Sequence, residues 1–221
     1  ELGEDAGKPL IDLVTKDLTA LAEHCYSVEE HCFYPAINDG TRLVPEDANE
    51  GVGYCHPSKL EKLPADGLLF LSYARAYNLT HQESFREMAE SLAAGMGWEN
   101  LIVPDTYDGK ATEPDPHGWV NTGQNDVCAL FGLLELHSAT GDSNILKSAN
   151  SLGSQLLDRY QVEDLIVSHG TTGETNIDTA LPLALLHLSA AGEGSRSDLP
   201  AFYANNTYFD PKIVIRKRKE L

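Results

Sequence analysis

Residues 68–93, LLFLSYARAYNLTHQESFREMAESLA, align with residues 128–153, CALFGLLELHSATGDSNILKSANSLG, at an offset of 60 residues (128 minus 68). In this alignment Thr80 falls on Thr140 and Ala89 on Ala149. Each copy has an apolar segment of helical length, a short polar turn, and a second segment with one apolar face. Two unrelated helical hairpins can also align loosely, but the shared turn and the aligned alanine favour a true repeat.

The rest of the chain extends this pattern of helices. The ranges 65–77, 124–139 and 176–191 are apolar nearly all round, which predicts buried helices. The ranges 9–24, 81–95 and 143–160 have one apolar face and predict half-exposed helices. Pro182 either kinks its helix or marks its true start. Residues 25–63 read as an extended loop, with room for short strands.

This alternation predicts an all-α fold of repeated helical hairpins, forming an arc or part of an (α/α) toroid. Buried helices would form the inner ring and half-exposed helices the outer ring. The hairpin domain would span residues 1–195, followed by a tail, 196–221, with one candidate strand, IVIR. Three units of 60 residues do not close a ring, so the chain forms an open arc, or a second chain or missing half completes it.

The connections predict where a ligand binds. Turns within hairpins are short, whereas the segments that lead into buried helices, 25–64, 96–123 and 161–175, are long and should emerge on one face. They carry aromatic, amide, imidazole and charged side chains, which suit sugars because aromatic faces stack on C–H groups and polar groups bind hydroxyls. The candidate binding residues are Tyr54, His56, Lys59, His117, Trp119, Asn121, Gln124, Asn125, His169, Glu174 and Asn176.

These candidates also have structural interpretations. Asn121 and Asn125 could cap the helix that follows, and Trp119 could pack within its loop. The four cysteines form no CxxC pair and are better explained as buried free thiols than as zinc ligands. The formal net charge of −18 argues against nucleic acid or an anionic membrane as partner. No apolar run is long enough to cross a bilayer.

Three stretches resemble the distal part of pectate lyases of polysaccharide lyase family 2. They are HCFYPAINDGTRL (31–43), GVGYCHPSKLEKLPADGLLFLSYARAYNLT (51–80) and MAESLAAGMG (88–97). The residues that match the family pattern are Pro35, Asp39, Gly40, Thr41, Gly53, Tyr54, Tyr73, Ala74, Ala76 and Tyr77. The resemblance implies an (α/α) toroid that cleaves polygalacturonate by β-elimination with a divalent cation. The family's histidine-containing metal and base motif is not found in this sequence, so the resemblance assigns no catalytic residue or metal ligand here.

The implied chemistry needs a base for the C5 proton and a cation or hydrogen-bond donor for the uronate carboxylate. Arg42, Lys59 and Lys62 lie in a segment that could bind this carboxylate, although each could equally be an ordinary surface residue. The acidic chain would repel pectate unless the cleft is locally basic or a metal bridges the two.

The sequence is also compatible with other functions. A glycoside hydrolase would need two carboxylates, for which Glu174 with Asp115 or Asp126 is the available set. A non-catalytic helical domain that binds sugar or another protein would need no such chemistry. The expected partner is an oligo- or polysaccharide, and periplasmic, secreted and cytoplasmic locations are all compatible with the sequence.

Overall fold

The computed structural model describes residues 4–37, 39–44, 60–105, 122–166, 180–196 and 199–201. Its helices are α1 Glu4–Ala20, α2 Gly67–Thr80, α3 Glu83–Gly95, α4 Thr122–Thr140, α5 Ser143–Tyr160 and α6 Leu181–Glu193. Strands β1 Tyr26–Ser27, β2 Cys32–Phe33 and β3 Leu63–Pro64 form a small antiparallel sheet in that order. Strands β4 Gln161–Val162 and β5 Leu165–Ile166 form a separate hairpin.

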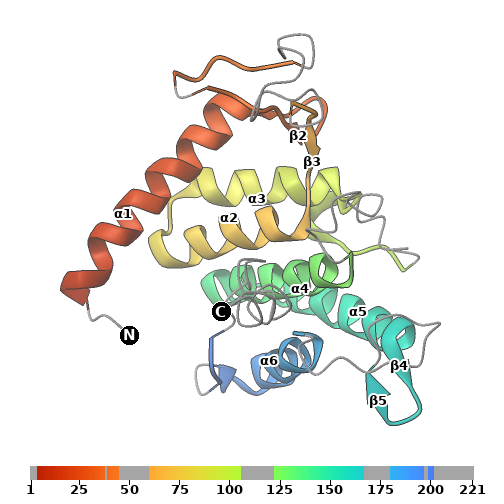
Figure 1. Cartoon of the computed structure of the whole chain (residues 1–221). Helices are drawn as coiled ribbons and strands as arrows, with labels where there is room; N and C mark the ends of the chain where they lie inside the picture. Colours follow the sequence, from red (N-terminus) through yellow and green to blue (C-terminus); the bar gives the residue numbers. More distant parts are fainter. Residues whose placement is uncertain are drawn as a thin grey trace, which may run out of the picture.

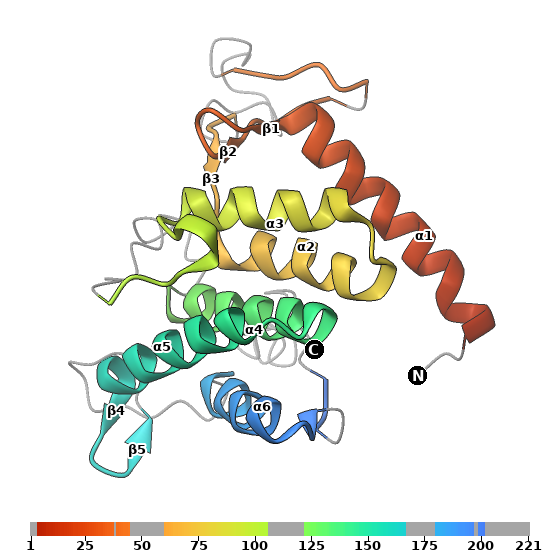
Figure 2. The same ribbon diagram turned by 180° about the vertical axis from the view of Figure 1, so that it is seen from behind.

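The predicted all-α class is confirmed, and each predicted helix overlaps an observed one (Figure 1). The helices form layers, with α2 and α3 in one, α4 and α5 in the next, and α6 beyond them (Figures 1 and 2). Pro182 lies in the first turn of α6, so this proline marks the start of the helix and does not kink it. The short strands expected between residues 25 and 63 are β1, β2 and β3. The IVIR segment lies outside the described residues.

The 60-residue repeat is confirmed at atomic detail in the two hairpin turns. The Thr80 hydroxyl donates to the Ala76 carbonyl at 2.7 Å, and the Thr140 hydroxyl donates to the Leu136 carbonyl at 2.8 Å. Each threonine oxygen also accepts from the backbone N–H two residues later. The residue between them is left-handed in both turns, with φ of 54° at His81 and 69° at Gly141. The same hydrogen bonds therefore close both helices and reverse the chain.

The core lies between the two hairpin layers. Phe70 of α2 is fully buried and makes an edge contact with Trp98, with ring centroids 5.8 Å apart. Gly132 of α4 allows this packing, because a Cβ there would come within 2.5 Å of the Phe70 ring. Ala89 and Ala149, the aligned alanines of the repeat, are both fully buried. Ala89 lies on α3 and Ala149 on α5, so small residues at these positions let the two helices of each hairpin approach closely.

The prediction that residues 176–191 form a buried helix is wrong for the described part, α6. Only Leu181, Ala184 and His187 are buried in α6, whereas Leu186 is 56% exposed. One side of α6 packs against α4 and α5, and no described element covers its other side. An apolar helix is buried all round only when it has neighbours all round, and α6 lies at one end of the stack.

The opposite end of the stack is also open. The range 9–24, predicted as a half-exposed helix, carries its apolar face on Leu10, Leu13, Val14, Leu18 and Leu21, but only Leu18 is buried. The N-terminal half of α1 extends away from the other helices (Figures 1 and 2). The described helices thus form an open stack, and closure into a toroid stays a prediction.

Candidate functional site

The N-terminal ends of α2 and α4 meet, which is the geometry that the predicted binding face requires. The Gly67 backbone N–H donates to the Asn125 side-chain oxygen at 2.5 Å, and Asn125 is 5% exposed. Gly67 permits this approach, since a Cβ there would lie 2.1 Å from the Asn125 carbonyl oxygen. The first turns of the two helices therefore lie side by side.

Asp66 completes this junction as the N-cap of α2. Its carboxylate accepts a hydrogen bond from the Leu69 N–H at 2.7 Å. Burial raises the pKa of Asp66 more than the backbone N–H groups of Leu69 and Leu68 lower it. Cys128, in the second turn of α4, is buried, and burial raises the pKa of its thiol to about 12. The thiol is therefore protonated near neutral pH and is not a nucleophile there.

A buried ion pair lies beside the junction. Asp126 of α4 is 1% exposed and accepts from Arg159, near the end of α5, with Nη1 to Oδ2 at 2.6 Å. The Arg159 guanidinium also lies 5.9 Å from the Tyr160 ring centroid. Burial raises the pKa of Tyr160, and the carboxylate of Asp126 acts in the same direction. The pair joins the start of α4 to the end of α5.

A second group of charged side chains surrounds the small sheet. The Lys62 ammonium donates to Glu30 at 2.9 Å, and the Tyr34 hydroxyl donates to the same carboxylate oxygen at 2.5 Å. The Arg42 guanidinium lies 5.1 Å from the centroid of the Tyr34 ring. We call Glu30, Tyr34, Arg42 and Lys62 the sheet corner. Arg42 and Lys62 were candidates from sequence, whereas Tyr34 and Glu30 were not.

Most predicted binding residues lie outside the described residues. These are Tyr54, His56, Lys59, His117, Trp119, Asn121, His169, Glu174 and Asn176. Gln124 belongs to α4, but its side chain lies outside the described part. Asn125 is described, and its side-chain oxygen holds α2 against α4. This contact is structural, but it is not the predicted helix cap. The Asn125 oxygen accepts from an N–H group of α2 and not from one of its own helix, α4.

Sequence analysis missed Arg159 and the role of Asp126 in holding it. Arg159 lies in the last turn of an amphipathic helix. A cation is common at this position because it interacts favourably with the helix dipole. Its partner lies 33 residues earlier, so no local spacing connects them. The signal that sequence did offer was an acidic residue directly before a long apolar run, in QND of residues 124–126.

Among the described residues, no group of three or more His, Cys, Asp or Glu side chains could hold a metal ion. The described cysteines are free thiols, with Cys32 and Cys128 buried and Cys25 partly buried. Cys55 lies outside the described residues.

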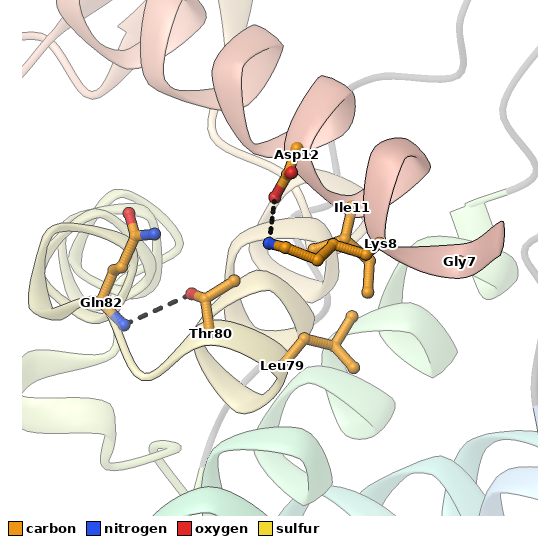
Figure 3. A pocket seen from close by; sticks show the side chains of 7 residues that line it. All are labelled: Gly7, Lys8, Ile11, Asp12, Leu79, Thr80 and Gln82. Atoms are coloured by element: carbon orange, nitrogen blue, oxygen red, sulfur yellow. Dashed lines mark hydrogen bonds and ion pairs between the residues drawn. The ribbon is translucent and has the colours of Figure 1, made fainter. Parts of the chain in front are cut away.

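One hollow of about 760 Å³ lies between α1 and the α2–α3 turn (Figure 3). It is at the C-terminal end of α2, opposite to the junction with α4. Its polar side chains interact locally, with the Lys8 ammonium 3.2 Å from the Asp12 carboxylate. The lining residues are Gly7, Lys8, Ile11, Asp12, Leu79, Thr80 and Gln82. This set offers no aromatic platform, so the junction of α2 and α4 remains the candidate site.

The described helices form stacked hairpins, and α2 and α4 meet at their N-terminal ends. A family model described as periplasmic pectate lyase matches residues 1–212. The chain belongs to this family, which confirms the resemblance, and it is a carbohydrate-active protein of the pectate lyase class with a polysaccharide substrate. A periplasmic or secreted location is compatible with this family. Within the described part of the chain, no helix combines the length and apolarity needed to cross a bilayer.

Proposed function

We propose that this chain forms part of the polygalacturonate-binding cleft of a pectate lyase. The contact between Asn125 and Gly67 is the observation that carries this proposal. It supports a model in which the segments that lead into α2 and α4 line one cleft. The elimination base and the ligands of the divalent cation would come from outside this chain, since its sequence lacks the family's histidine motif.

In this proposal the chain orients the sugar units and leaves the bond cleavage to other groups. β-Elimination removes the C5 proton and expels the oxygen at C4, so the reacting sugar must be held rigidly against the base. Trp119 would supply an apolar face for a sugar ring, and neighbouring amide groups would bind hydroxyls. Positive side chains near the cleft would offset the repulsion between an acidic protein and an acidic polymer.

The Trp119→Ala variant tests the cleft directly. Removal of a stacking face should weaken oligogalacturonide binding by about 1–3 kcal/mol, measured by titration calorimetry. Thermal unfolding should change less, because a side chain that lines an open cleft contributes little to the core. The Asn125→Ala variant is the matched comparison and should mainly lower the melting temperature, since its side chain holds two helices together. A Trp119→Ala variant with lower stability and unchanged affinity would place the cleft elsewhere.

The glycoside hydrolase alternative is less favoured. Of its three candidate carboxylates, Asp126 is described, and it is 1% exposed and paired with Arg159, so its carboxylate is not presented to a ligand at the surface. The non-catalytic alternative shares the sugar-binding cleft and differs from our proposal only in that no lyase reaction takes place there.

For location, we propose the periplasm, as the description of the matched family suggests. Cell fractionation that follows the full-length protein would test this. A purely cytoplasmic fraction would contradict it.

A further inference from the structure

The Asp39-Gly40-Thr41 sequence builds a tight turn whose next residue is Arg42. The Ile37 N–H donates to the Thr41 carbonyl at 3.0 Å, and the Asp39 carboxylate accepts from the Thr41 N–H at 2.9 Å. Gly40 has a φ of +87°, which favours glycine, and a Cβ there would come within 2.9 Å of the His24 ring. Arg42 then pairs with Ala36 across the hairpin.

The guanidinium of Arg42 is fixed by neutral groups. Its Nε donates to the His24 carbonyl at 2.8 Å, and its Nη2 donates to the Tyr26 carbonyl at 2.7 Å. The Tyr34 ring lies under the same guanidinium. Among the ion pairs of the described residues, none includes Arg42. An exposed arginine that is held rigidly but not neutralised is prepared to bind an anion, because little side-chain entropy remains to be lost.

The other members of the sheet corner add a second cation. Lys62 lies 5.8 Å from the centroid of the same Tyr34 ring and pairs with Glu30. Hydrogen bonds from Tyr34, Lys62 and Cys32 lower the pKa of Glu30 to about 2, so its carboxylate stays ionised and keeps Lys62 in place. With two cations and one carboxylate, the sheet corner carries a net positive charge on a chain whose net charge is −18.

The position of the sheet corner suits an extended substrate. Strand β3 ends at Pro64, two residues before Asp66, the N-cap of α2, so the sheet adjoins the N-terminal end of α2 (Figures 1 and 2). The junction of α2 and α4 lies at this same end. A polymer bound along the proposed cleft could therefore continue towards the sheet corner.

We propose that the sheet corner is a carboxylate-binding subsite for a galacturonate unit, with Arg42 as the group that binds the carboxylate. Arg42 would donate N–H groups to the carboxylate oxygens, and Lys62 would strengthen the local positive potential. This inference rests on the proposed function. It makes the subsite specific for the free acid, since a methyl-esterified unit carries no charge at this position.

Titration calorimetry with hexagalacturonate and with its fully methyl-esterified form tests the proposal on the whole chain. The Arg42→Gln variant should bind the acid about tenfold more weakly, as expected for loss of a charge-assisted hydrogen bond, while its affinity for the ester stays unchanged. The Lys62→Gln variant should show a smaller loss for the acid only. The Arg86→Gln variant is the matched control, because it removes a partly exposed arginine on α3 that pairs with Glu90.

Equal losses for acid and ester, or no loss for either, would overturn the subsite. If Arg42→Gln loses its circular dichroism signal, the Lys62→Gln result decides, and unchanged acid binding there would reject the proposal. A parent chain that binds neither oligosaccharide would contradict the proposed function itself. A parent chain that binds both while Arg42→Gln behaves identically would contradict the subsite alone.

Discussion

At Gly67 the two hairpins approach each other closely. Its missing side chain lets the start of α2 lie against Asn125, and an added Cβ would come within 2.1 Å of a backbone oxygen that cannot move alone. We expect Gly67→Ala to lower the free energy of unfolding by about 1–3 kcal/mol, the usual effect of overpacking a core. Urea denaturation measures this.

The Gly7→Ala variant is a suitable control for that experiment. Gly7 lies in α1, and a Cβ there would have no neighbour within 4 Å. Alanine favours a helix interior by about 0.5–1 kcal/mol relative to glycine, so this variant should not be destabilised. A Gly67→Ala variant as stable as the parent would show that the contact with Asn125 is looser than described.

The Asp126–Arg159 pair gives a second prediction at this scale. Replacing Asp126 by Asn keeps the shape but leaves the Arg159 cation without its carboxylate in a partly buried site. We expect a loss of about 1–3 kcal/mol in unfolding free energy, below the full cost for a wholly buried pair because Arg159 is 29% exposed.

For comparison, Glu90→Gln breaks the exposed pair with Arg86 and should cost at most about 0.5 kcal/mol. Equal effects of the two substitutions would show that burial adds nothing to the Asp126 pair. Thermal and urea unfolding of both variants would decide this.

The helices that could be predicted from sequence are those that form a hairpin with a helix adjacent to them in the sequence. α2 with α3, and α4 with α5, are hairpins in which periodicity and the threonine turns act together, so their bounds follow from the chain itself. The exposure of α6 could not be predicted, because it depends on which element packs against its outer side. The Asp126–Arg159 pair and the Tyr34 ring under Arg42 likewise depend on packing between separate elements.

The attachment of α6 to the residues that follow it should depend on pH. His187 lies between two partners, with Nδ1 3.2 Å from the Arg196 Nε and Nε2 2.9 Å from the Pro200 carbonyl. Arg196 in turn donates to the buried Glu135 at 2.7 Å. Burial lowers the pKa of His187, with the nearby Arg196 acting in the same direction. The neutral ring accepts from Arg196, whereas a protonated ring cannot.

We therefore expect the free energy of unfolding to fall as pH decreases below the unfolded histidine pKa of about 6.5. In that range the unfolded chain binds a proton that the folded chain resists, so acidification favours unfolding. Urea midpoints at pH 8 and pH 5.5 would measure this. His187→Gln keeps a donor and an acceptor and should reduce the difference, whereas the exposed His81→Asn variant should retain it. An undiminished difference in His187→Gln would assign the effect to other groups.

Glu135 should act in a lower pH range than His187. Burial opposes its ionisation, but Arg196, Asn78 and Arg75 together outweigh burial and lower its pKa. Its contribution to stability should be present above the unfolded value of 4.5 and be lost as pH falls through its lower folded value. His187 and Glu135 both contact Arg196, so the stability of this one region should depend on pH in two successive ranges.

For the molecule as a whole, we expect little lyase activity from this chain alone. Incubation with polygalacturonate and a divalent cation should give almost no rise in ultraviolet absorbance from unsaturated product. The reason is that the family's metal and base motif is missing from this sequence and that the described residues lack a metal-binding group. Robust activity would show that the catalytic centre lies within residues outside the described ranges.

The two open ends of the stack lead to the last prediction, that the isolated chain self-associates. At one end Leu13 and Val14 of α1 are 57% and 53% exposed, and at the other Leu186 of α6 is 56% exposed. Two different apolar surfaces favour head-to-tail contacts between chains, and such contacts need not close into a ring. The sedimentation coefficient should therefore rise steadily with protein concentration. The net charge of −18 opposes association, so salt should promote it by screening. Leu13→Gln should reduce the association and Leu165→Gln, on the exposed β5 strand, should not. A monomer at all concentrations in high salt would show that neither end acts as a packing surface.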